Sequence, residues 1–164
     1  MSERAIQVML VDDEAELVEF LAKRLKRKGL DVTAMTSAKE ALDKLDDQAF
    51  DVVVLDLKMP EMDGLQALRE IKARQPFTQV VMLTGHGSLD TALESGRQHA
   101  YRFLSKPAEF SELLEVVKEA AARKRKDLRR AYDEEVAELM STVMDPSDIL
   151  TGSKKLREKY FQED

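Results

Sequence analysis

The chain has 164 residues, of which 43% are hydrophobic and 35% are charged, and its formal net charge is -6. This composition suits one domain with a packed core plus a shorter appendage, and the acidic balance disfavours binding to nucleic acid. Because the chain has no cysteine, disulfides, thiolate catalysis and cysteine metal sites are excluded. No apolar run approaches the roughly 20 residues that a membrane helix needs, and the N-terminus lacks the apolar stretch of a secretory signal, so we expect a cytoplasmic protein.

Short apolar runs alternate with amphipathic segments along most of the chain. The apolar runs predict strands at 5–11, 30–35, 50–56, 78–84 and 101–105. Apolar residues at helical spacing predict helices at 14–29, 37–48, 64–75 and 88–99, and a long helix that begins near Glu109. Ser37 stands where a cap of the second helix is expected, and Gly29 stands where the first helix stops. This alternation predicts an α/β fold, with a parallel sheet covered by helices on both faces.

Polar residues stand at the ends of four of the predicted strands. Asp12 and Asp13 follow the first strand, Asp56 ends the third, Thr84 ends the fourth, and Lys106 follows the fifth. Because the carboxyl ends of parallel strands meet at one edge of a sheet, we expect these residues to share one pocket. Taken singly, each has an ordinary explanation: a turn former, a surface lysine or, for Asp13, a cap of the following helix. Their joint occurrence favours a functional site.

The chemistry of this pocket suggests phosphoryl transfer. Three close carboxylates repel one another, and Mg²⁺, which prefers oxygen ligands, relieves that repulsion. The metal ion and the ammonium group of Lys106 would attract a phosphoryl group, and the hydroxyl of Thr84 would donate a hydrogen bond to one of its oxygens. We therefore interpret Asp56 as a nucleophile that attacks phosphorus and becomes an acyl phosphate.

Four segments then match a known family. They are "VDDE" (11–14), "LDLKMPEMDG" (55–64), "LTGHG" (83–87) and "FLSKP" (103–107). Over roughly residues 5–122 the chain resembles the CheY-like receiver domain of two-component response regulators. The resemblance implies a flavodoxin-like, doubly wound sheet of five parallel strands in the order 2-1-3-4-5, with residues 1–122 as the phosphoacceptor domain and a C-terminal helical extension.

The resemblance also implies roles for the residues around the metal. Asp56 would accept the phosphoryl group from a phosphohistidine of a sensor histidine kinase or a phosphotransfer protein. Asp13 would bind Mg²⁺ directly, and Asp12 would lie beside it, as a direct ligand or through a water molecule. Lys58 would offer its backbone carbonyl to the metal.

A second group of residues would respond to phosphorylation. Thr84 would move toward the phosphoryl group, and Phe103, at the position of the switch aromatic, would change rotamer with it. Lys106 would pair with the phosphate, and the Lys106–Pro107 bond would be cis, which proline makes feasible. The affected partner-binding face would comprise the helix at 88–99, the last strand and the long helix.

The preferred interpretation is a response regulator that catalyses only its own phosphorylation and dephosphorylation and is not a turnover enzyme. It would signal through altered contacts with a downstream protein. One alternative is a degenerate receiver that serves as a constitutive scaffold, against which the intact set of site residues argues. Another is a metal-dependent phosphohydrolase, for which the sequence offers no substrate pocket or lid.

Residues 123–164 form a predicted helical tail with no recognisable output domain. We interpret the basic stretch "RKRKDLRR" (123–130) as the solvated surface of the extended long helix rather than a nucleic-acid contact. An apolar stripe follows at helical spacing: Tyr132, Val136, Leu139, Met140 and Val143. The pattern breaks at "DPSD" (145–148), and a short helix is predicted at 153–164. The stripe would pack on the receiver, pair with a second chain as a coiled coil, or bind another protein; we favour a homodimer through the extended helix.

Overall fold

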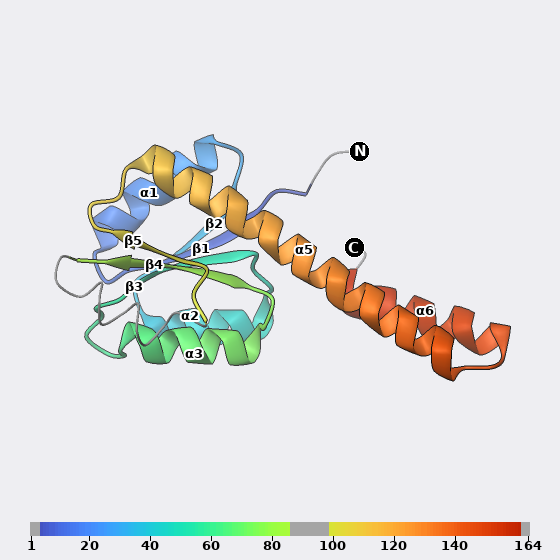
Figure 1. The fold of residues 1–164 in the computed structure, drawn as a ribbon. Helices are drawn as coiled ribbons and strands as arrows, with labels where there is room; N and C mark the ends of the chain where they lie inside the picture. The colour runs from blue at the N-terminus through green and yellow to red at the C-terminus, as the bar shows by residue number, and fades with distance from the viewer. Residues whose placement is uncertain (1–3, 86–98, 162–164) are drawn as a thin grey trace. The chain divides into compact units, whose positions relative to one another are not determined.

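Five strands pair in parallel into one sheet in the computed structural model, which describes residues 4–85 and 99–161 (Figure 1). The strands are β1 (Gln7–Val11), β2 (Asp31–Met35), β3 (Val52–Asp56), β4 (Gln79–Thr84) and β5 (Arg102–Ser105). Their order is β2-β1-β3-β4-β5, with every neighbouring pair parallel. The predicted α/β fold and its strand order are therefore confirmed.

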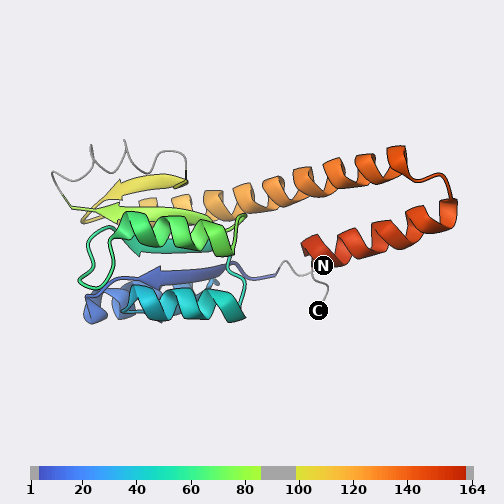
Figure 2. The ribbon, with the colours of Figure 1, turned by 90° about the horizontal axis from the view of Figure 1, so that it is seen from below.

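Helices cover both faces of this sheet (Figure 2). They are α1 (Ala15–Arg27), α2 (Ala38–Asp47), α3 (Gly64–Arg74) and α5 (Phe110–Thr142). Successive strand residues alternate between the two faces, as the pleat of a strand requires. Val8 and Leu10 pack with α1 and α5, whereas Met9 and Val11 pack with α2 and α3. The two apolar layers explain why the central strands read as continuous hydrophobic runs.

Local sequence signals set the ends of several helices. The side chain of Ser37 caps α2 by accepting a hydrogen bond from the Glu40 N–H at 3.4 Å, as predicted. Asp63 caps α3 in the same way, accepting from the Leu65 N–H at 3.0 Å. Gly29 has a φ of 89°, a left-handed conformation that lets the chain leave α1. These two hydrogen bonds thus fix the residues at which α2 and α3 begin.

Up to the start of the long helix, the predicted elements occur wherever the structure describes the chain, and their ends lie within one or two residues of the predicted ends. Helix ends fray, and differences of this size are usual. The helix predicted at 88–99 lies outside the described residues, apart from His99. The tail is the place where the prediction and the structure diverge.

A polar network ties α5 to the amino-terminal ends of two strands. The Nζ atom of Lys124 donates to the Phe50 carbonyl at 2.9 Å and lies 3.2 Å from Oδ1 of Asp51. The other carboxylate oxygen of Asp51 accepts the Gln7 N–H at 2.8 Å. The Lys124 side chain is only 13% exposed, so these contacts satisfy a largely buried ammonium group. Lys124 is also the residue at which the first of two units, Met1–Lys124, ends.

The second unit, Arg125–Asp164, is a helical hairpin. In it, the remainder of α5 is followed by α6 (Pro146–Phe161), which runs back along α5 (Figures 1 and 2). The prediction that the last helix begins at residue 153 was wrong. Asp145 accepts hydrogen bonds from the Ser147 N–H at 2.8 Å and the Ser147 hydroxyl at 2.7 Å, and proline is well tolerated in the first helical turn. The "DPSD" stretch therefore ends one helix and starts the next. Among the described helices, none is long and apolar enough to cross a membrane.

The close approach of Gly64 to the end of β3 predicts a destabilising substitution. A Cβ atom at Gly64 would lie 2.6 Å from the Leu57 carbonyl oxygen and 2.9 Å from that of Asp56, and neither backbone atom can rotate away. We expect Gly64→Ala to lower the free energy of unfolding by about 1–3 kcal/mol, the usual cost of overpacking, measured by urea denaturation. Gly85→Ala is the matched control, because no atom of the described residues lies within 4 Å of its added Cβ atom. Equal stability of the two variants would contradict this reading of Gly64.

Candidate functional site

The carboxyl ends of four strands bring the predicted site residues to one edge of the sheet. Asp12 directly follows β1, Asp56 is the last residue of β3, Thr84 the last of β4, and Lys106 directly follows β5. β1 and β4 flank β3 on either side, so Asp56 lies at the centre of this edge. The topology thus assembles groups that are far apart in the sequence.

Three carboxylates converge at this edge. One oxygen from each of Asp12, Asp13 and Asp56 lies within 4.8 Å of the others. Asp12 and Asp56 are buried, with 4% and 6% of their surface exposed, whereas Asp13 is exposed. A cluster of oxygen donors with one solvent-facing member suits a hard divalent cation such as Mg²⁺, which binds carboxylates and retains water ligands.

Backbone N–H groups hold the two buried carboxylates in place. Asp12 accepts the Glu14 N–H at 3.0 Å, and Asp56 accepts the Lys58 N–H at 3.4 Å. The side chain that accepts a backbone hydrogen bond at the start of α1 is thus that of Asp12 and not that of Asp13. Asp13 makes no such helix cap, and its carboxylate is directed to the cluster.

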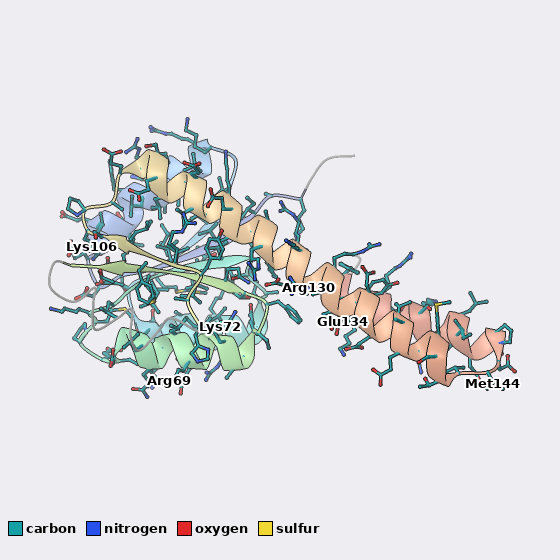
Figure 3. All side chains as sticks on the ribbon, in the orientation of Figure 1. Arg69, Lys72, Lys106, Arg130, Glu134 and Met144 are labelled. Atoms are coloured by element: carbon teal, nitrogen blue, oxygen red, sulfur yellow. The ribbon has the colours of Figure 1, made fainter. Side chains whose placement is uncertain are left out.

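Lys106 supplies the positive charge of the site (Figure 3). Its Nζ atom lies 2.7 Å from Oδ2 of Asp12 and 3.3 Å from Oδ1 of Asp56, so the shorter contact is with Asp12. The Lys106 N–H donates to the Thr84 carbonyl at 2.7 Å, and the Lys106–Pro107 peptide bond is cis. Sequence reasoning grouped Lys106 with these acids but had no means to rank Asp12 above Asp56 as its partner.

The electrostatics of the site oppose ionisation of Asp56. Burial raises the pKa of Asp56 and the negative charge of Asp12 raises it further, while Lys106 and the Lys58 N–H partly counteract both effects. For Lys106, burial alone would lower the pKa, but the hydrogen bond and charge of Asp12, together with Asp56, raise it overall. Lys106 is thus favoured in its ammonium form, whose single positive charge offsets only part of the negative charge of the three carboxylates.

The two predicted switch residues, Thr84 and Phe103, stand on β4 and β5. The Thr84 side chain is fully buried, and its hydroxyl group has no hydrogen-bond partner among the residues that the structure describes. A buried polar group without a partner is unusual and calls for a ligand or a second conformation. Phe103 is half-buried and packs against the apolar layer under α2 and α3.

Sequence reasoning missed the role of Gly64. The loop after β3 folds back so that the Gly64 N–H donates to the Leu57 carbonyl at 3.0 Å, next to Asp56. Only a residue without a side chain fits there. The sequence does contain a glycine at the end of the "MPEMDG" segment. The position of that glycine in the sequence does not reveal that its backbone approaches the carbonyl of Leu57.

Comparisons with known proteins match one family over most of the chain. Residues 8–118 match the model of the response regulator receiver domain. The chain is 37% identical over 120 residues to the transcriptional regulatory protein GlrR of Escherichia coli strain K12, covering 73% of this chain and 27% of GlrR. It is 30% identical over 153 residues to the DNA-binding transcriptional regulator NtrC of Klebsiella pneumoniae, covering 93% of this chain and 31% of NtrC. The chain thus spans about a quarter to a third of the length of these relatives.

Solved structures give the same result for the fold. A response regulator receiver domain protein from Clostridium thermocellum superimposes with a TM-score of 0.69 at 33% identity, covering 73% of this chain and 97% of that one. Asp12, Asp56, Thr84 and Lys106, at the carboxyl ends of the strands, all lie within the matched range 8–118. The chain therefore belongs to the family of response regulator receiver domains of two-component systems.

Proposed function

We propose that this domain accepts a phosphoryl group on Asp56, in a reaction that requires Mg²⁺, from a phosphohistidine of a sensor histidine kinase or a phosphotransfer protein. The observation that carries the proposal is the setting of Asp56. It is a buried carboxylate 3.3 Å from the Lys106 ammonium group, beside two further carboxylates, at the central position of the sheet edge. Such a group can act as a nucleophile toward phosphorus only where cations offset the charge of both reactants.

The chain's own residues would divide the work of transfer. A carboxylate oxygen of Asp56 forms a bond to phosphorus while the bond to the donor imidazole nitrogen breaks, and the imidazole leaves with that electron pair. Asp12, Asp13, Asp56 and the backbone carbonyl of Lys58 would hold Mg²⁺. When bound, Mg²⁺ supplies positive charge that offsets repulsion among the carboxylates and the incoming phosphoryl oxygens.

Phosphorylation would then act through Thr84, Lys106 and Phe103. The hydroxyl of Thr84, which has no hydrogen-bond partner among the described residues, would donate to a phosphoryl oxygen. Lys106 would exchange its contact with Asp56 for one with the phosphate. Phe103, which is only half-buried, would change rotamer as Thr84 moves. Because Thr84 and Phe103 stand on β4 and β5 and Lys106 directly follows β5, the change would alter the protein contacts of β5 and α5.

We further propose that residues 1–122 form the phosphoacceptor domain and residues 123–164 form a helical tail that self-associates into a homodimer. The change of unit after Lys124 and the end of the family match at residue 118 support this division. The protein would act in the cytoplasm, binding Mg²⁺ there and passing the signal to a downstream protein. Relatives GlrR and NtrC are named as transcriptional regulators, and each is several times longer than the matched region.

Phosphorylation of Asp56 is tested with a small-molecule donor. Incubation with acetyl phosphate and Mg²⁺ should add one phosphoryl group to the intact protein, detected by mass spectrometry, and EDTA should prevent the gain. Asp56→Asn should remain unmodified, whereas Asp43→Asn, which removes an exposed carboxylate on α2, should be modified like the parent chain. A constitutive scaffold predicts no mass gain in any of them, and a phosphohydrolase predicts steady release of phosphate from added phosphoesters.

The raised pKa of Asp56 predicts a pH-dependent stability. In EDTA, ionised Asp56 is less favourable in the folded than in the unfolded chain, so this penalty is absent below the unfolded pKa of about 3.9 and is complete above the raised folded pKa. Asp56→Asn should therefore unfold at higher urea concentration than the parent at pH 7, and this advantage should shrink as the pH falls. Asp43→Asn should show no such advantage. A less stable Asp56→Asn at pH 7 would contradict the direction of the shift.

Self-association through the tail predicts a change of mass on truncation. A chain that ends at Lys124 retains every buried residue of α5, the last of which is Ala121, and retains the contacts of Lys124. In sedimentation velocity this chain should stay monomeric at concentrations where the full chain shows a monomer–dimer equilibrium. Dimerisation of the truncated chain to the same extent would place the contact elsewhere.

A further inference from the structure

The loop between β3 and α3 carries one residue of the proposed metal site. Residues 57–63 form this loop, and its second residue is Lys58, whose backbone carbonyl would bind Mg²⁺. Backbone hydrogen bonds hold both ends of the loop. The Leu57 N–H donates to the Leu83 carbonyl at 3.0 Å, and the Gly64 N–H donates to the Leu57 carbonyl at 3.0 Å. The position of the middle of the loop depends on other contacts.

A side chain from another strand end contacts the middle of this loop. Ser37 stands two residues after β2, at the same edge of the sheet as Asp56, and its hydroxyl donates a hydrogen bond to Oε2 of Glu61 at 3.1 Å. The same hydroxyl oxygen accepts the Glu40 N–H at 3.4 Å. Because a hydroxyl group can donate and accept at once, Ser37 both caps α2 and holds the loop after β3. The bond thus joins α2 to the loop before α3, and these helices lie side by side on one face of the sheet (Figure 2).

Apolar contacts bring the same two segments together. Met35 ends β2, and Met59 and Met62 flank the middle of the loop. All three are half-buried and pack against the apolar layer under α2 and α3. The carbonyl of Met35 also accepts the Asp12 N–H at 3.1 Å. The end of β2 therefore adjoins the backbone of Asp12 and, through Ser37, the loop after β3, so it contacts two parts of the proposed metal site.

We propose that Ser37 and Glu61 are positioning residues for Mg²⁺. Their hydrogen bond holds the loop after β3 in the conformation that binds the ion and thereby raises the affinity of the site, although neither side chain belongs to the acidic cluster. This inference rests on the proposed Mg²⁺-dependent function and adds a determinant of it outside that cluster. Mg²⁺ demands near-ideal ligand geometry, and residues that orient the ligands of a metal commonly alter its affinity.

Calorimetric titration of the full chain with Mg²⁺ measures this effect. Ser37→Gly removes the donor and Glu61→Ala removes the acceptor, and each should raise the dissociation constant of Mg²⁺ by about three- to tenfold. Glycine is well tolerated as an N-cap, so α2 loses little stability in Ser37→Gly. Because both substitutions break the same bond, the double variant should bind Mg²⁺ no more weakly than the weaker of the two single variants. Fully additive effects of the two substitutions would contradict a shared bond.

Conservative substitutions separate the hydrogen bond from the negative charge of Glu61. Glu61→Gln removes the charge but retains an oxygen acceptor, and Ser37→Thr retains the hydroxyl donor. In about 0.15 M salt, which screens exposed charges, both should bind Mg²⁺ nearly as tightly as the parent chain. Glu40→Gln, which removes an exposed carboxylate in the first turn of α2, is the matched control and should also bind like the parent. An effect of Glu61→Gln as large as that of Glu61→Ala would mean that charge acts alone, against the proposal.

Hydrogen exchange in EDTA provides a second measurement that does not involve the metal. The backbone amides of residues 58–63 should exchange faster in Ser37→Gly and in Glu61→Ala than in the parent chain, while those of α3 stay protected. Unchanged exchange in this loop, or an unchanged dissociation constant of Mg²⁺ in both variants, would overturn the positioning role. A parent chain that binds no Mg²⁺ would instead refute the proposed function and this inference with it, and the titration of the parent reports that outcome separately from the variants.

Discussion

The crowding of negative charge at one edge of the sheet is the constraint on which the rest of the site depends. Asp12, Asp13 and Asp56 lie within 4.8 Å of one another, and two of them are buried. Such a cluster is unstable unless positive charge accompanies it, because desolvation and mutual repulsion both disfavour ionised carboxylates. The ammonium group of Lys106 supplies part of this positive charge, and it lies closer to the carboxylate of Asp12 than to that of Asp56. Of the two buried carboxylates, the central one, Asp56, thus has the longer contact with the ammonium group.

This distribution has a chemical meaning. A nucleophile that is firmly paired with an ammonium group would be held in its ground state, whereas one with a longer and weaker contact is free to react. The Lys106 ammonium group is placed between the two acids, within reach of both. The buried hydroxyl of Thr84 is a further polar group without a hydrogen-bond partner among the described residues. These features support the proposed binding of a phosphoryl group at this site.

Much of the fold and the site could be predicted from sequence because the relevant signals are local. Apolar runs of strand length, each followed by a polar residue, fix both the strands and the edge at which Asp56 and Lys106 meet. What could not be predicted depends on distances between segments. The choice of Asp12 as the nearer partner of Lys106 and the approach of Gly64 to Leu57 are set by packing. In the tail, "DPSD" was interpreted as an end only, because a proline that stops one helix can equally open another.

Lys124, the last residue of the first unit, lies far along the chain from the acidic cluster and at the start of the segment that follows the domain. This lysine closes a hydrogen-bonded network with Phe50 and Asp51 at the edge of the sheet opposite Asp56. All buried residues of α5 precede it. A segment fused after this position would inherit a helix already fixed to the domain, and no residue of the acidic cluster would need to change. The architecture therefore allows the segment after Lys124 to change in sequence without any change at the acidic cluster.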